Sequence, residues 1–219
     1  GPDMSNCAAM AQSLAAAGAA ITVRDVDELT ASVGRLLGDA VERAARAAAA
    51  AGIAADNRAV LHAVLARRPP DNKDLPRLVY TRMVIEESMR LYPPAHTMAR
   101  QALADDRLRD THVPAGSVVM VVPWLLHRHR HLWERPDSFE PDRFAAEAAG
   151  ARPRFAYIPF GAGPRTCIGA AFAMTEAILL LAAIAQRWRL RLAPDARIEP
   201  AGLITLRPRY GMPMRLERR

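Results

Sequence analysis

A glycine-containing loop that leads directly into the most regular helical pattern of the chain constrains its fold more than any other feature. Apolar residues recur at helical spacing from Ile168 to Trp188, which predicts one long helix. The ten residues Phe160–Gly169 overlap the start of this helix and contain three glycines and one cysteine, Cys167. Because the start of a helix stabilises negative charge, Cys167 is placed to ionise to a thiolate.

The residues of this loop, taken alone, allow two interpretations. Glycine lets the backbone turn tightly and approach a flat ligand closely. Arg165 supplies a cation that suits either a thiolate or the carboxylate of a ligand. A lone cysteine, however, is more often a small buried residue with a structural role. A structural cysteine therefore stays open as the alternative to a reactive or metal-binding thiolate.

The whole run resembles the haem-binding signature of the cytochromes P-450, Phe-x-x-Gly-x-Arg-x-Cys-x-Gly, at every fixed position. The resemblance implies that the Cys167 thiolate is the iron ligand of a haem b. It also implies that four further residues of the loop bind or contact this cofactor: Phe160, Gly161, Arg165 and Gly169. A thiolate ligand pushes electron density into the iron and favours cleavage of an O–O bond.

Two further runs resemble motifs of the same family. Glu87 and Arg90 lie one helical turn apart, as in its Glu-x-x-Arg motif, although such a pair alone is most often a surface salt bridge. The segment Phe139–Phe144 resembles the family's Pro-x-Arg-Phe segment, and Arg143 is its arginine. The resemblance implies a structural triad of Glu87, Arg90 and Arg143 that holds the coil before the cysteine loop.

The resemblance also suggests how the carboxylates of the cofactor are bound. Arg165, in the loop, and Arg100, ten residues after Arg90, stand where the family supplies arginines to the haem propionates. Two arginines match two carboxylates in charge. His96 is a further candidate for a propionate or for the open face of the haem, with a surface role as the alternative. The histidines of segment 127–131 form either a solvated or metal-binding patch or, by resemblance, part of the family's framework without binding the iron.

The periodicity along the chain predicts a mainly α protein with small β sheets, a truncated cytochrome P-450-like fold. Residues 1–4 look like the remnant of a removed tag, residues 5–70 form an alanine-rich helical segment in the place of the family's distal helix, and residues 71–219 form the haem-binding core. Within the core we expect a helix over 74–91, strands over 97–103 and 117–123, a short helix over 123–128, an ordered coil over 129–159, and short strands in the last thirty residues.

Before Asp74 the resemblance weakens, and the family's N-terminal half has no counterpart. Counting back from Glu87 by the family's spacing reaches Ala31–Arg35, where the family has a glycine with an acid–threonine pair that helps to deliver protons. Gly34 is present there, but the acid–threonine pair is absent. This departure puts ordinary monooxygenation in question.

The charge and composition of the chain limit the kinds of partner that it is expected to bind. The formal net charge is +7 and the sequence pI is about 10.3, which suits docking of an acidic ferredoxin or flavodoxin. Scattered arginines without an aromatic platform argue against nucleic acid. We see no run of about 18 apolar residues and so expect no membrane span. Two distant cysteines, Cys7 and Cys167, form no disulfide framework, which favours the cytoplasm.

The sequence thus leads to one favoured function and one main alternative. The favoured function is that of a haem-thiolate enzyme that oxidises a small organic substrate with oxygen and a reductase, or with peroxide. The alternative is a haem-binding module without monooxygenase activity, such as a sensor, a carrier or a catalyst of a non-oxidative reaction. In either case we expect a homodimer or a partner chain to cover the open haem face. A degraded relative is least favoured, because the motifs around Cys167 are intact.

Overall fold

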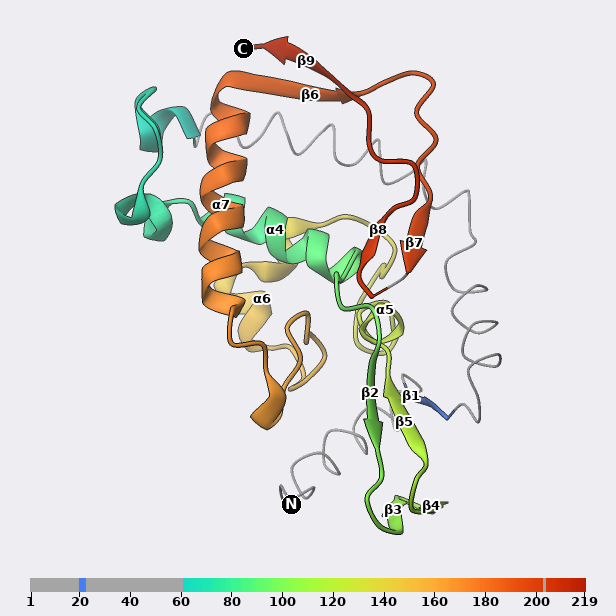
Figure 1. Cartoon of the computed structure of the whole chain (residues 1–219). Helices are drawn as coiled ribbons and strands as arrows, with labels where there is room; N and C mark the ends of the chain where they lie inside the picture. Colours follow the sequence, from blue (N-terminus) through green and yellow to red (C-terminus); the bar gives the residue numbers. More distant parts are fainter. Residues whose placement is uncertain (1–19, 23–60, 203) are drawn as a thin grey trace.

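The computed structural model describes residues 20–22, 61–202 and 204–219. Of the alanine-rich segment expected to be helical over 5–70, residues 5–19 and 23–60, including Ala31–Arg35, lie outside the described residues. Its described part before residue 61 is β1 (Ala20–Thr22). β1 pairs antiparallel with a strand of the core, so these three residues of the alanine-rich segment form a strand. Its Ile21 and Thr22 are β-branched residues of the kind that favour strands. Figure 1 draws the described elements in colour.

The helix expected over 74–91 is two elements, a 3₁₀ helix η1 (Asn72–Arg77) and the helix α4 (Val79–Leu91). Asp71 begins η1 early, since its carboxylate accepts the Lys73 N–H at 2.7 Å while its own N–H donates to Asp74. Pro76 lacks an N–H and cannot continue an α-helical ladder, so the two elements separate at Leu78. As predicted, α4 ends just before Pro93 and Pro94.

The long helix predicted after the cysteine loop is confirmed as α7 (Ala170–Arg187). It packs against α4 around a buried cluster of five apolar side chains: Leu61, Leu65, Leu78, Ile178 and Ala182. The end of the alanine-rich segment therefore packs into the same core as α4 and α7. By length and composition α7 could also cross a membrane, and 11% of it is buried. A helix covered by other protein passes the same test, so this is weak evidence.

The strands form small antiparallel sheets. The two strands expected between α4 and the coil are β2 (Met98–Gln101) and β5 (Val118–Val121), in a sheet of order β1-β5-β2. An additional hairpin lies between them, made of β3 (Asp106–Leu108) and β4 (Thr111–Val113). The C-terminal strands pair as β6 (Trp188–Leu192) with β9 (Met214–Arg218) and as β7 (Pro200–Gly202) with β8 (Leu206–Pro208).

The segment expected as an ordered coil is mostly irregular but contains short helical turns. The short helix that precedes the coil is α5 (Pro123–Leu126). The coil itself contains η2 (Pro141–Phe144) and α6 (Ala146–Gly150). A second buried cluster fixes this segment against α4, made of Met83, Trp133, Phe144 and Ala156. The coil is thus held by apolar packing as well as by backbone turns, and it leads towards the cysteine loop.

We predict that Leu78→Ala destabilises the chain by about 2–5 kcal/mol, because Leu78 is fully buried between η1, α4 and α7 and its loss leaves a cavity. Leu180→Ala, which shortens a 55% exposed side chain of α7, should cost much less. Urea unfolding followed by circular dichroism measures both. Equal losses for the two variants would contradict the packing described here.

Candidate functional site

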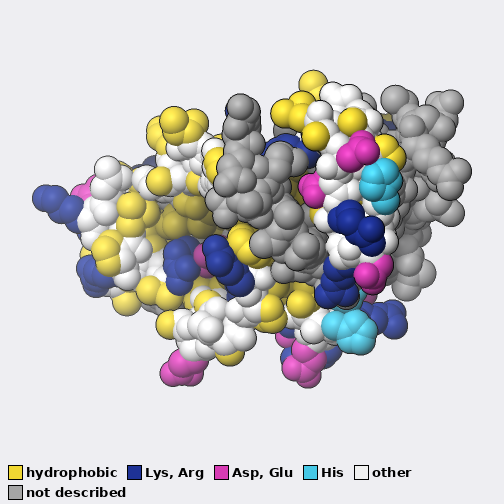
Figure 2. All heavy atoms as spheres, turned by 90° about the horizontal axis from the view of Figure 1, so that it is seen from below, with side chains coloured by type: hydrophobic (Ala, Val, Ile, Leu, Met, Phe, Trp, Pro, Cys, Tyr) yellow, Lys and Arg dark blue, Asp and Glu magenta, His cyan; other side chains and the backbone are white. Residues whose placement is uncertain are grey.

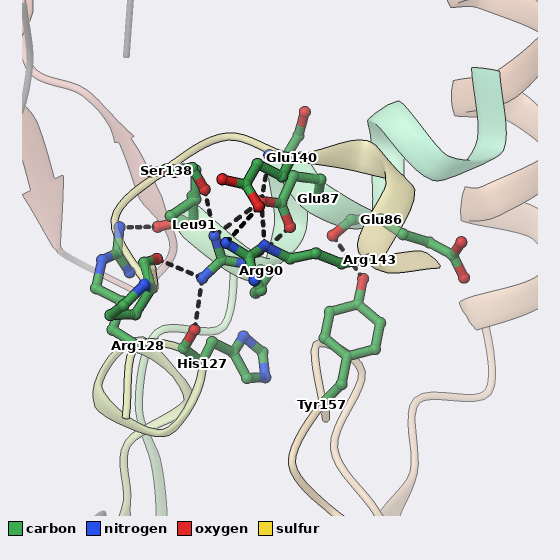
Figure 3. A network of polar contacts seen from close by, with 12 residues as sticks. Glu86, Glu87, Arg90, Leu91, His127, Arg128, Ser138, Glu140, Arg143 and Tyr157 are labelled. Carbon is green, nitrogen blue, oxygen red and sulfur yellow. Dashed lines mark hydrogen bonds and ion pairs between the residues drawn. The ribbon is translucent and has the colours of Figure 1, made fainter. Parts of the chain in front are cut away.

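A buried ion pair on α4 is the centre of the polar network in Figure 3. Glu87 and Arg90 are both 0% exposed. The Arg90 Nε donates to Glu87 Oε2 at 2.6 Å, and its Nη2 donates to Glu87 Oε1 at 2.8 Å. Their i, i+3 spacing places both side chains on one face of the helix. The pair is therefore a bidentate salt bridge inside the protein and not a surface salt bridge.

The remaining N–H groups of Arg90 all donate to backbone carbonyls of His127, which follows α5, and of the coil. They bond the oxygens of His127 at 2.8 Å, Pro136 at 2.6 Å and Ser138 at 2.9 Å. With the two bonds to Glu87, all five N–H groups of the guanidinium are used. Glu87 Oε1 also accepts the backbone N–H of Glu140 at 2.8 Å. The ion pair thereby ties α4 to the coil at three places and to His127 at a fourth.

Arg143, the third member of the predicted triad, lies beside this pair on η2. Its Nε is 3.5 Å from Glu87 Oε1 and its Nη2 is 3.0 Å from the Glu140 carboxylate. Its Nη2 also donates to the Arg135 carbonyl at 2.8 Å. Burial lowers the pKa of Arg143, and the neighbouring Arg90 charge acts in the same direction. The structure thus brings Glu87, Arg90 and Arg143 together.

Two residues for which the sequence suggested no role fasten the end of the coil. The Tyr157 hydroxyl donates to the Glu86 carbonyl at 2.9 Å, and burial raises the Tyr157 pKa. The Arg152 guanidinium lies over the rings of Trp133 at 4.8 Å and Phe144 at 4.3 Å. The partner of Tyr157 lies 71 residues away in sequence, and those of Arg152 lie beyond one helical turn, so no helical spacing reveals them.

His127 is fully buried next to the same network. The Ile158 backbone N–H donates to its Nε2 at 2.9 Å. Because that nitrogen accepts, the neutral ring carries its proton on Nδ1. Burial, and after it the charge of Arg90, lower the pKa of His127 to about 3. Among the described residues no group of three His, Cys, Asp or Glu could hold a metal ion, so the patch at 127–131 does not form a metal site there.

The cysteine loop is held by its own backbone and leaves the thiol accessible. The Cys167 N–H donates to the Phe160 carbonyl at 2.9 Å, and the Gly161 N–H donates to the Ile158 carbonyl at 3.0 Å. Gly161 and Gly163 have φ of +77° and +74°, which glycine adopts without strain. Cys167 is a free, exposed cysteine three residues before the first residue of α7. Ile168 beside it is fully exposed.

The remaining predicted residues lie on separate elements. Arg165 is exposed at the end of a 3₁₀ turn, η3 (Gly163–Arg165), whereas Arg100 lies on β2 and its Nη1 donates to the Ala99 carbonyl at 2.7 Å. His96 is buried, not on the surface, and burial lowers its pKa. Within the part of the chain that the structure describes, no hydrogen bond or ion pair joins Arg165, Arg100 or His96 to Cys167.

We predict that Glu87→Gln destabilises the chain by about 3–5 kcal/mol, because it leaves the buried Arg90 charge without its counter-ion. The matched control is Arg82→Gln in the Arg82–Glu86 pair of the same helix, where Arg82 is 41% exposed. That change should cost at most about 1 kcal/mol. Denaturant midpoints compare the two variants, and a smaller loss for Glu87→Gln than for Arg82→Gln would refute the role given to the buried pair.

We predict that stability falls as the pH is lowered from about 6.5 towards 3, in part through His127. The folded state keeps the ring neutral, whereas the unfolded chain takes up a proton below the ordinary pKa of 6.5. This one group contributes a slope of up to about 1.4 kcal/mol per pH unit. In His127→Gln the slope between pH 6 and 5 should be smaller, measured by urea unfolding at each pH. An unchanged slope would mean that His127 is protonated in the folded protein.

Comparison with known proteins places these features in one family. The sequence model of the family Cytochrome P-450 matches residues 57–210. Cyclooctatin synthase of Streptomyces melanosporofaciens is 46% identical over 152 residues, which are 68% of this chain and 33% of that protein. Pentalenene oxygenase of Streptomyces avermitilis is 38% identical over 143 residues, 65% of this chain and 32% of that protein. The chain thus spans about a third of the length of these curated relatives.

A solved structure agrees in fold. A crystal structure of a cytochrome P-450 superposes with a TM-score of 0.69 and 32% sequence identity, covering 77% of this chain and 38% of the other. The helices and small sheets therefore form part of that fold, as the sequence predicted. On the family match and this superposition, the chain belongs to the cytochrome P-450 family.

Proposed function

We propose that this chain binds haem b through the thiolate of Cys167 and takes part in monooxygenation of the cytochrome P-450 type. The observation that carries the proposal is an exposed thiol on a loop whose base is anchored to a buried ion-pair network. Curated relatives that carry the same family core are named as oxygenases or monooxygenases. Bound haem supplies the redox chemistry, and the protein supplies the ligand, its orientation and its surroundings.

The residues around Cys167 fit a flat, largely apolar group. Ile168 is fully exposed and Phe172, on the first turn of α7, is 73% exposed, so apolar side chains flank the thiol. Gly161 lies close to Met98, since a Cβ there would be 3.4 Å from the Met98 sulfur, and its φ of +77° favours glycine. The free energy falls when a ligand removes apolar side chains of this kind from water. Phe160, Gly161 and Gly169 are proposed to line the proximal side of the haem.

The charged groups proposed for the propionates are Arg165, from the cysteine loop, and Arg100, from β2. Arg165 is exposed and Arg100 partly so, which leaves both guanidinium groups able to meet carboxylates. His96, two residues before β2, is a further candidate. Its burial and lowered pKa favour a neutral ring that can donate one hydrogen bond and accept another.

The substrate and partners are proposed from chemistry. A small organic substrate fits the names of the relatives, which include pentalenene oxygenase and cyclooctat-9-en-7-ol 5-monooxygenase. A net charge of +7 favours an acidic ferredoxin or flavodoxin as electron donor in the cytoplasm, with peroxide as the alternative oxidant. Figure 2 shows a face on which hydrophobic side chains gather beside charged ones. A second copy or a partner chain is proposed to cover the haem's open face.

One observation favours the alternative of a haem-binding module without monooxygenase activity. The sequence has no acid–threonine pair over Ala31–Arg35 to deliver protons. A sensor, a carrier or a non-oxidative catalyst needs the thiolate but not that pair. Product formation from an organic substrate, tested separately with a reductase and with peroxide, distinguishes the enzyme from such a module.

We predict that Cys167→Ser abolishes the thiolate band in the carbon monoxide difference spectrum of the reduced, haem-loaded chain, because a serine hydroxyl does not supply the anionic sulfur ligand. Cys7→Ser is the matched control, since Cys7 is the other cysteine of the chain, and it should leave the band intact. A thiolate band that survives Cys167→Ser, or a wild-type chain that binds haem without one, would refute the assignment.

A further inference from the structure

A buried histidine stands between the ion pair of α4 and the segment that enters the cysteine loop. His127 is 0% exposed and lies just after α5. Its carbonyl accepts an N–H of Arg90 at 2.8 Å, while its Nε2 accepts the Ile158 N–H at 2.9 Å. One residue thus contacts both the ion pair, by its backbone carbonyl, and the start of the loop, by its ring. Figure 3 shows the contact of the His127 carbonyl with Arg90.

We propose that His127 is a positioning residue for Cys167: its imidazole acts as the acceptor that fixes the backbone of Ile158 and thereby sets where the cysteine loop begins. The inference rests on the proposed function, since it concerns the placement of the proposed iron ligand. It assigns His127 a role that acts through the backbone, without contact to the haem or to a substrate.

The hydrogen bonds from Ile158 onward lead to the thiol in short steps. The Ile158 carbonyl accepts the Gly161 N–H at 3.0 Å, which closes the turn at the start of the loop. Next to Gly161, the Phe160 carbonyl accepts the Cys167 N–H at 2.9 Å, which closes the loop itself. A displacement of Ile158 therefore moves the carbonyl to which the Cys167 backbone is bonded.

The surroundings of the ring keep it an acceptor. Arg90 and Arg128 are the positive charges that act on the His127 ring, and both oppose its protonation. The centroid of the Tyr157 ring lies 5.2 Å from that of the His127 ring. Burial raises the pKa of Tyr157, so its hydroxyl stays neutral. A protonated imidazole has no free lone pair, so a neutral ring is what the bond to Ile158 requires.

Three variants of the full chain test the inference. His127→Phe keeps a planar ring but removes the acceptor, whereas His127→Gln keeps an acceptor oxygen. The matched control, His131→Phe, makes the same exchange at an exposed histidine four residues away. Two quantities are measured in each chain: hydrogen exchange of the Ile158 amide relative to the amides of α4, and the share of carbon monoxide-bound haem that shows the thiolate band.

In His127→Phe we expect the relative protection of the Ile158 amide to fall about tenfold, the effect of losing one buried hydrogen bond. We also expect a smaller thiolate share, with the lost part appearing as haem bound by a neutral thiol. His127→Gln should recover at least half of both quantities, and His131→Phe should match the wild type. A residue needed only for folding would not give this rescue together with a spectral change in the folded fraction.

Wild-type protection and thiolate share in folded His127→Phe would overturn the inference, as would a failure of His127→Gln to improve on His127→Phe. If His127→Phe does not fold, a folded His127→Gln with the wild-type thiolate share supports the acceptor role, and an unfolded His127→Gln refutes it. Failure of the proposed function looks different: the wild-type chain then shows no thiolate band, while the Ile158 exchange still reports on His127.

Discussion

The buried contact between Glu87 and Arg90 is the interaction on which the rest of the described structure depends. Removing two such charges from water costs several kcal/mol each, and their mutual attraction offsets this only when the remaining polar atoms are also bonded. Here those atoms bond to His127 and to the coil, through the carbonyls of His127, Pro136 and Ser138. The charges can be buried only when the coil is in place, and the coil is held in place only when the charges are buried.

This mutual requirement explains how an irregular segment can hold a loop precisely. The coil has few ladder hydrogen bonds of its own, so its position comes from the side chains that reach it from α4 and from its own apolar cluster around Trp133 and Phe144. Apolar packing is non-directional and tolerates small shifts, whereas the guanidinium contacts are directional. The ion pair sets where the coil lies, and the packed rings stabilise it there.

The sequence predicted those parts of the molecule in which the deciding contacts are local. Helical periodicity found α7 and most of α4, and Pro93 marked where α4 ends. The break at Leu78 was missed, because it depends on how the side chain of Asp71 caps the chain ahead of Pro76. In the site, spacing and resemblance identified Glu87, Arg90 and Arg143, which the structure brings together. The sequence assigned no role to Tyr157 and did not reveal the bond of the His127 ring to Ile158, because these partners are 71 and 31 residues away.

The same contrast separates the two sides of the thiol. On the side of the coil, the backbone N–H groups of Ile158, Gly161 and Cys167 each donate to a partner within the described residues. On the side of α7, the apolar side chains of Phe172, Leu180 and Ile184 are exposed, and exposed apolar surface on one helix is typical of a place where another molecule binds. Positioning Cys167 and covering the apolar side chains of α7 are therefore separate tasks in this fold. Hydrogen bonds within the described residues carry out the first, whereas the described residues leave the second undone.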